Sequence, residues 1–81
     1  MDVLYFAWVR ERIGLPKEKV DTSASTVMEL VEELRLCEER YALAFSDISA
    51  LRVAIDQDLT DFEASIVGAR EVAFFPPMTG G

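Results

Sequence analysis

The residues of this chain whose types and spacing could do chemistry lie at its end. The sequence closes on Pro76-Pro77-Met78-Thr79-Gly80-Gly81, and no charged side chain follows Glu71. Glycine has no Cβ and few forbidden backbone angles, so a terminal glycine pair presents its carboxylate on the narrowest and most flexible backbone available. Such a tail can enter a channel that excludes side chains. Its carboxylate becomes an acyl donor once it is activated, for example as an acyl-adenylate.

Two prolines precede this end and direct it. Pro76 and Pro77 fix their own φ and restrict the residue before them, which favours an extended exit from the domain. From Pro76 onward an extended chain would reach on the order of 20 Å. We therefore expect Pro76, Pro77, Thr79 and Gly80 to thread into a partner and Gly81 to react there. The alternative is a frayed terminus of no consequence.

The acidic residues offer a weaker candidate site. Asp56, Asp58, Asp61 and Glu63 form the densest carboxylate cluster outside the predicted helix. A calcium loop needs alternating oxygen ligands around a glycine at its sharp turn, but here the spacing slips after Asp58 and no glycine is present. We predict a solvated turn and no metal site.

Nucleophilic catalysis within the domain is also not expected. The chain has no histidine, so the common Ser-His and Cys-His arrangements cannot be assembled. The single cysteine, Cys37, lies on the apolar stripe of the predicted helix, and we expect it to be a small core residue. No P-loop or dinucleotide-binding glycine motif occurs. The sequence predicts no internal enzyme active site.

Composition limits the class of protein and of partner. The chain has 81 residues, enough for one small domain, and 51% of them are hydrophobic. Its net charge of −7 disfavours nucleic acid and anionic membranes and favours basic partners, unless it only maintains solubility. Asp2 stands where a signal peptide would carry bases, and Arg10 interrupts the first apolar run. We therefore expect a cytoplasmic protein with neither a signal peptide nor a membrane span.

Two apolar runs are expected to form the centre of a sheet. Residues 3–9 are apolar on both faces, which predicts a strand that is central or covered by a partner on one side. Residues 71–75 form a second apolar strand that the prolines end. Three shorter strands are expected over 17–22, over 51–56 and around Leu59, with a turn at Gln57-Asp58.

One amphipathic helix should cover this sheet. Thr26 is a predicted N-cap, and Glu29 completes a capping box. The following apolar residues share one helical face: Val27, Leu30, Val31, Leu34 and Cys37. A short helical or irregular segment is expected over 38–47, a single helical turn from Phe62 to Ile66 and a turn at Gly68-Ala69.

This order of elements predicts an α+β domain with the β-grasp, or ubiquitin-like, arrangement. One main helix would pack on a mixed sheet whose first and last strands pair in parallel at its centre. The expected domain spans residues 1–75, and the tail spans residues 76–81.

Particular segments resemble a known family. Val3-Leu4-Tyr5-Phe6-Ala7, Val9-Arg10-Glu11 and the ending from Glu71, with its Pro-Pro-x-x-Gly-Gly, resemble the small subunit of molybdopterin synthase. That family is a β-grasp sulfur carrier, and the resemblance spans nearly the whole chain. The chain departs from it at Asp56, where the family often has Asn, and at Gly68-Ala69-Arg70, where the family usually has Asp-Gly-Asp.

The resemblance implies a reaction cycle that uses the terminal carboxylate. An E1-like enzyme would adenylate Gly81 with ATP, and the adenylate would be converted to a thiocarboxylate. The charged tail would then enter the large subunit of a heterotetrameric synthase and donate sulfur to a pterin precursor in molybdenum cofactor biosynthesis. The catalytic side chains would belong to the large subunit, and this chain would be a sulfur donor with no tightly bound cofactor.

The same resemblance implies that Phe6, Leu59 and Phe75 form an apolar docking face on the sheet. Three alternatives stay open from the residues. One is a sulfur carrier for another pathway, such as thiamine synthesis or tRNA thiolation. Another is a ubiquitin-like modifier whose Gly81 forms an isopeptide bond. The last is an interaction module with an idle tail.

Overall fold

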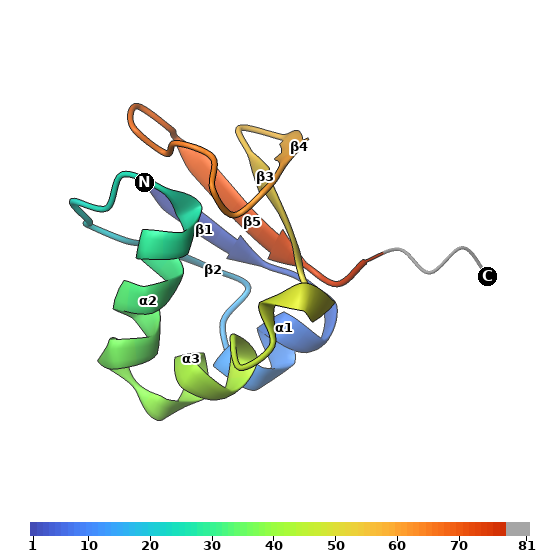
Figure 1. Cartoon of the computed structure of the whole chain (residues 1–81). Coiled ribbons are helices and arrows are strands. Elements are labelled where there is room, and N and C mark those ends of the chain that lie inside the picture. Colours follow the sequence, from blue (N-terminus) through green and yellow to red (C-terminus); the bar gives the residue numbers. More distant parts are fainter. Residues whose placement is uncertain (78–81) are drawn as a thin grey trace.

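The computed structural model describes residues 1–77. Its elements in chain order are β1 (Asp2–Tyr5), α1 (Ala7–Ile13), β2 (Lys17–Lys19), α2 (Val27–Cys37), α3 (Glu39–Ala44), the 3₁₀ turn η1 (Ile48–Ala50), β3 (Arg52–Ile55), β4 (Asp58–Thr60) and β5 (Glu71–Phe75). The strands form one sheet in the order β2-β1-β5-β3-β4. β1 and β5 are parallel, and the other three pairs are antiparallel. This is the predicted β-grasp topology, with all three helices on one side of the sheet (Figure 1).

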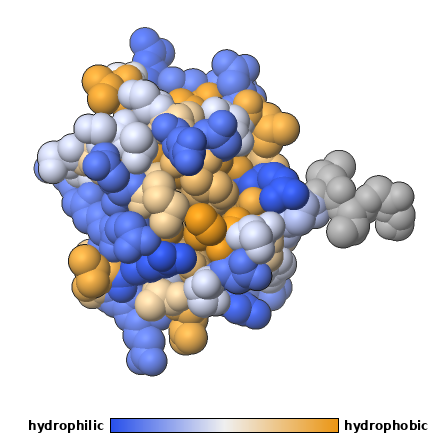
Figure 2. All heavy atoms as spheres, in the orientation of Figure 1, coloured by the Kyte–Doolittle hydropathy of each residue, from blue (hydrophilic) through white to orange (hydrophobic). Residues whose placement is uncertain are grey.

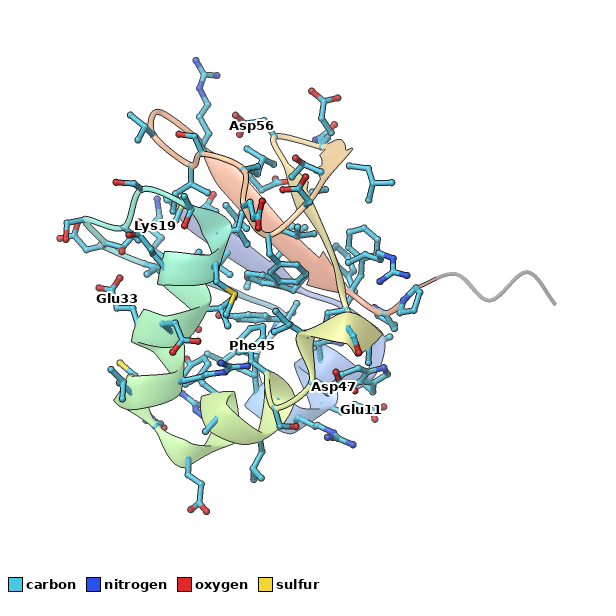
Figure 3. The ribbon with its side chains drawn as sticks, in the orientation of Figure 1. Glu11, Lys19, Glu33, Phe45, Asp47 and Asp56 are labelled. Atoms are coloured by element: carbon cyan, nitrogen blue, oxygen red, sulfur yellow. The ribbon has the colours of Figure 1, made fainter. Side chains whose placement is uncertain are left out.

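The core lies between the sheet and the helices. Val3 and Tyr5 of β1 and Val72 and Phe74 of β5 alternate inward and are buried. Phe45, which follows α3, packs edge-on against Phe74 with ring centroids 4.9 Å apart. Phe45 lies in the middle of the molecule (Figure 3). These rings give a small domain a dense centre, because aromatic side chains bury large apolar areas.

The main helix forms as predicted. The Thr26 side chain accepts a hydrogen bond from the backbone N–H of Glu29, and the Glu29 carboxylate accepts one from that of Thr26. This capping box satisfies backbone donors that the first turn leaves unpaired. The apolar stripe from Val27 to Leu34 is buried against the sheet. Residues 39–44 form the short helix α3 within the segment where a short helical or irregular region was expected.

Cys37 is exposed, and its predicted place in the core is wrong. It is the last residue of α2, and the next residue, Glu38, is extended. The chain turns away there toward α3, so the end of the apolar stripe extends past the sheet. Helical periodicity predicts which face a residue shares but not where the neighbouring layer ends.

The first apolar run is not one strand, as the sequence predicted, but a strand followed by a helix. β1 ends at Tyr5, Phe6 is the extended N-cap and Ala7 begins α1 with φ +53°. Val9 and Ile13, spaced i and i+4, are buried by α1, and Gly14 ends the helix in the left-handed conformation at φ +90°. The sequence does not reveal this change from strand to helix. Because odd and even positions are both apolar, the run fits the two-residue period of a strand and the 3.6-residue period of a helix equally well.

The loops after β3 also differ from expectation. The hairpin turn is Asp56-Gln57 rather than Gln57-Asp58, since both residues have positive φ and Ile55 pairs with Asp58. Two left-handed residues match the type I′ turn of two-residue hairpins.

The expected helical turn from Phe62 to Ile66 does not form. That segment is an irregular loop, anchored by the buried Ile66.

Candidate docking face and tail exit

The end of β5 sets the direction in which the chain leaves the sheet. Phe74 is fully buried. Its ring lies nearly parallel to that of Tyr5, with centroids 6.3 Å apart, and also contacts the ring of Phe45. The next residue, Phe75, is the last of the strand and is half-buried. Pro76 and Pro77 follow it and cannot donate to a strand ladder. The buried Phe74 ring therefore fixes the position from which the C-terminal residues start, at the edge of the molecule (Figure 1).

The face of the sheet that no helix covers carries an apolar row across four strands. Leu4 of β1 pairs with Ala73 of β5, Ala73 pairs with Ala54 of β3, and Ala54 pairs with Leu59 of β4. Register partners point to the same side of a sheet, so these four side chains lie side by side. Leu59 is 70% exposed, whereas the two alanines are nearly buried between larger neighbours. The result is a shallow apolar surface with a leucine on each side.

A second row lies closer to the tail exit. Phe75 pairs with Arg52 across β5 and β3. The Phe6 backbone N–H donates to the Phe74 carbonyl at 3.1 Å, which continues the parallel pairing beyond Tyr5. The Phe6 backbone is extended, and the residue before it, Tyr5, points into the core. Because successive residues of an extended chain point to opposite sides, the Phe6 side chain points to the uncovered face, where it is 44% exposed. We call the set Leu4, Phe6, Ala54, Leu59, Ala73 and Phe75 the open face.

The three predicted docking residues thus lie on one face. Phe6, Leu59 and Phe75 come from three different elements, and the pairing of β1, β5, β3 and β4 brings them together. Their role in docking stays a prediction. Sequence reasoning missed Leu4, Ala54 and Ala73, although strand alternation from the buried Val3 and Val53 would have found two of them. Arg52, at the margin of this face, was also missed.

The opposite edge of the sheet is charged. Asp2 of β1 forms ion pairs with Lys17 and Lys19 of the edge strand β2, at 3.7 and 3.9 Å. Lysines on a short edge strand discourage another strand from pairing with it. The apolar open face therefore lies on the β1, β5, β3 and β4 side of the sheet, and the β2 edge next to it is charged.

A tyrosine–carboxylate cluster holds β1 and β2 in place beneath the open face. The Tyr5 and Tyr41 hydroxyls both donate to the same Glu18 oxygen, at 2.8 and 2.6 Å. Burial, followed by the hydrogen bond to Glu18 and its charge, raises the pKa of Tyr41 to about 12. The same causes raise the pKa of Tyr5 well above its ordinary value. Both phenols therefore remain neutral donors at physiological pH, and β2, α3 and β1 are tied at one point.

The carboxylates of the predicted solvated turn bond backbone groups. Asp56 Oδ1 accepts from the backbone N–H groups of Arg70 and Glu71, each at 2.9 Å, and Asp61 Oδ1 accepts from that of Glu63. Within residues 1–77 no group of three or more His, Cys, Asp or Glu side chains could hold a metal ion.

No helix in that part of the chain is long and apolar enough to cross a membrane. The predicted reactive and threading residues Thr79, Gly80 and Gly81 lie outside the described residues.

Solved structures share this fold. The structure of SAMP1 from Haloferax volcanii matches with a TM-score of 0.77 and 21% identity, covering 100% of this chain and 98% of that one. A putative molybdopterin converting factor, subunit 1, from Pyrococcus furiosus matches with a TM-score of 0.70 and 20% identity, covering 95% of each chain. At these identities the likeness concerns the fold, and it agrees with the β-grasp topology described above.

Sequence relatives are more similar and match along the whole chain. The molybdopterin synthase sulfur carrier subunit of Escherichia coli is 40% identical over 79 residues, which cover 98% of this chain and 96% of that protein. The protein of the same name from Haemophilus influenzae is 37% identical over 81 residues, covering 100% and 99%. A model of the ThiS family matches residues 3–81. With its fold, its full-length relatives and this match in agreement, the chain belongs to the ThiS family.

Proposed function

We propose that this protein is the sulfur carrier subunit of a heterotetrameric molybdopterin synthase in the cytoplasm, and that it carries sulfur as a thiocarboxylate on Gly81. The observation that carries the proposal is the full-length identity of 37–40% to two proteins named as that subunit. The Gly-Gly ending and the family match up to residue 81 support it.

The proposed chemistry uses the terminal carboxylate and nothing else from this chain. An E1-like activating enzyme binds ATP together with the tail. A Gly81 carboxylate oxygen attacks the α-phosphate of ATP, which releases pyrophosphate and forms an acyl-adenylate. Hydrosulfide, or a donor that delivers sulfur at the same oxidation level, then attacks the acyl carbon and displaces AMP, and the product is the thiocarboxylate. Its sulfur attacks a carbon of the pterin precursor within the large subunit and displaces an oxygen leaving group. Water then hydrolyses the resulting thioester, which leaves the sulfur on the pterin and restores the Gly81 carboxylate. The absence of histidine from the chain is consistent with a carrier whose catalytic side chains lie on its partners.

The arrangement of the described residues suits a carrier that must dock before its tail reacts. The open face includes Phe75, the residue from which the tail starts, and extends from it over the neighbouring strands. A partner that covers Leu59 and Phe75 is thereby placed where Pro76 and Pro77 direct the remaining residues. Docking next to the start of the tail raises the effective concentration of its terminus at the partner's site.

The proposal is tested by the intact mass of the protein purified from cells with an active sulfur pathway. A sulfur-for-oxygen exchange, mapped to the C-terminal peptide, is the expected result. Deleting Gly81 should abolish molybdopterin formation in a reconstituted assay with the large subunit. Undiminished product from the deletion variant would refute the proposal. Isopeptide conjugates to lysines, with no thiocarboxylate, would instead identify a protein modifier.

A further inference from the structure

An apolar slot lies at the β3–β4 side of the domain, outside the open face. It has a volume of about 360 Å³, and nearly all of its surface is apolar. Leu51 is buried at its base, and Ile48 and Phe62 pack against the core while staying partly exposed. The Phe62 ring stacks on Phe74 with centroids 6.3 Å apart, so the wall of the slot is supported from beneath. Figure 2 shows apolar side chains reaching the surface within a largely hydrophilic surround.

Arg52 stands at the mouth of this slot with part of its guanidinium uncommitted. Its Nη1 donates to the carbonyls of Ser49 and Leu51, at 3.3 and 2.8 Å. Among residues 1–77 no carboxylate lies within ion-pair distance of it, although the chain has fifteen acidic residues. The two carbonyls fix the orientation of the side chain. The Nε and Nη2 donors have no hydrogen-bond partner in that same range and can bind a carboxylate with two parallel bonds.

The slot is continuous with the open face. Arg52, which lines the slot, is the register partner of Phe75 on the open face. A partner that covers Phe75 therefore lies next to Arg52 at the mouth of the slot. This continuity argues for a protein segment as the occupant.

The chemistry of the slot also favours a protein segment over a small anion. A volume of about 360 Å³ lies at the low end of the range for ligand pockets, about 300–1,000 Å³. Its walls are apolar, which suits one or two hydrophobic side chains. The rim holds one cation, Arg52, beside the carboxylate of Asp61, so a free anion would gain little net attraction there. A carboxylate that belongs to a protein segment is held in addition by the apolar side chain next to it, which the walls of the slot bind.

We propose that the slot and Arg52 receive a segment of the large synthase subunit in which an apolar side chain stands next to an aspartate or glutamate. The apolar side chain fills the space over Leu51 and Phe62, and the carboxylate pairs with Arg52. The inference rests on the proposed function, since it names a second contact with the same partner. The Arg52 pair would orient the carrier on the partner, while the open face supplies most of the buried apolar area.

Binding of the full-length chain to the purified large subunit, measured by titration calorimetry, tests this contact. Arg52→Glu should weaken the affinity by at least about tenfold, because it places two carboxylates together at a contact that excludes water. Arg70→Glu is the matched control: Arg70 is exposed, has no ion pair within residues 1–77 and lies at the opposite end of β5. It makes the same change in charge, and its affinity should stay within about twofold of the wild type, as expected for a charge outside the contact. Equal losses in the two variants would overturn the proposal in favour of a general charge effect.

Photocrosslinking identifies the occupant directly. A benzophenone amino acid in place of Ser49, at the rim, should crosslink to the large subunit, and the crosslinked peptide should hold an acidic residue beside an apolar one. Crosslinks to a segment without a carboxylate, or none in a complex that still forms, would refute the slot contact. The proposed function has a separate outcome: if Arg52→Glu binds normally and Gly81 deletion still abolishes product, only the slot contact is wrong. A wild-type chain that fails to bind the large subunit would refute both.

Discussion

Phe75 and Arg52 are register partners on β5 and β3, so the residue from which the C-terminal tail starts lies beside an arginine at the edge of an apolar face. Phe75 is half-buried and Arg52 is exposed. The pairing links two features that are 23 residues apart in the sequence and that have no local reason to meet. It places the exit of the tail and the proposed docking surface at the same end of the sheet.

Charge on the open face should weaken docking without unfolding the domain. Leu59→Glu and Phe75→Glu each place a carboxylate where a partner would exclude water, and we expect at least about a tenfold loss of affinity for the large subunit. Val67→Glu is the control, because Val67 is 77% exposed and lies in the loop before β5. Helix content by circular dichroism should be unchanged in all three. Unfolding of Phe75→Glu would show that Phe75 belongs to the core. The affinity of Leu59→Glu for the large subunit would then decide whether the open face docks, and an undiminished affinity would contradict the prediction.

Glu18 should contribute to stability through the two hydroxyls that it accepts. Glu18→Gln keeps one acceptor oxygen but removes the charge that strengthens both hydrogen bonds, so we expect a loss of about 1–3 kcal/mol in the free energy of unfolding. Urea denaturation measures it. Glu11→Gln, which changes an exposed residue of α1, should cost less than about 0.5 kcal/mol. Equal costs for the two variants would mean that the tyrosine cluster adds nothing.

Stability should fall at high pH because of the same cluster. The ordinary pKa of a tyrosine is 10.0, and that of Tyr41 in the folded protein is raised to about 12. The folded state therefore holds its phenol protons more tightly than the unfolded state. The resulting stability is fully present below about pH 10 and is lost as the pH rises through about 12.

Urea midpoints between neutral pH and about pH 11 measure this loss, with phenolate absorbance recorded in parallel. Tyr41→Phe removes one ionising group, and its stability should depend less steeply on pH than that of the wild type. A wild-type protein whose phenols all titrate near pH 10, with no change in midpoint, would contradict the prediction.

Asp56 should hold the β3–β4 hairpin against the start of β5. Its φ of +49° is tolerated by Asn and Asp, and its Oδ1 accepts from two backbone N–H groups. Asp56→Ala should cost about 2–3 kcal/mol in unfolding free energy, because both N–H groups lose their acceptor and alanine disfavours this conformation. Asp56→Asn keeps an oxygen at the same position and should recover most of the loss. If asparagine destabilises as much as alanine, the hydrogen bonds are not the cause.

Local sequence was enough for several elements of this protein. The capping box of Thr26 and Glu29 and the spacing from Val27 to Leu34 determine the start and the buried face of α2, because they act within one or two turns. The prolines after Phe75 determine where β5 ends, since a residue without an N–H cannot continue a ladder. The Gly80-Gly81 ending could likewise be named from the sequence, as could the absence of a histidine-dependent site.

Only the tertiary structure decided the rest. Residues 3–9 are apolar on both parities, and the division at Phe6 follows from where β1 stops pairing with β5 and α1 packs on the core. Cys37 satisfies the helical period yet is exposed, because its place depends on where the sheet beneath α2 ends. Phe6, Leu59 and Phe75 share a face only through the register of four strands and the packing of every helix on the opposite side. Strand pairing and the packing of helices on a sheet are contacts between residues far apart in the chain, so a pattern within one short segment cannot specify them.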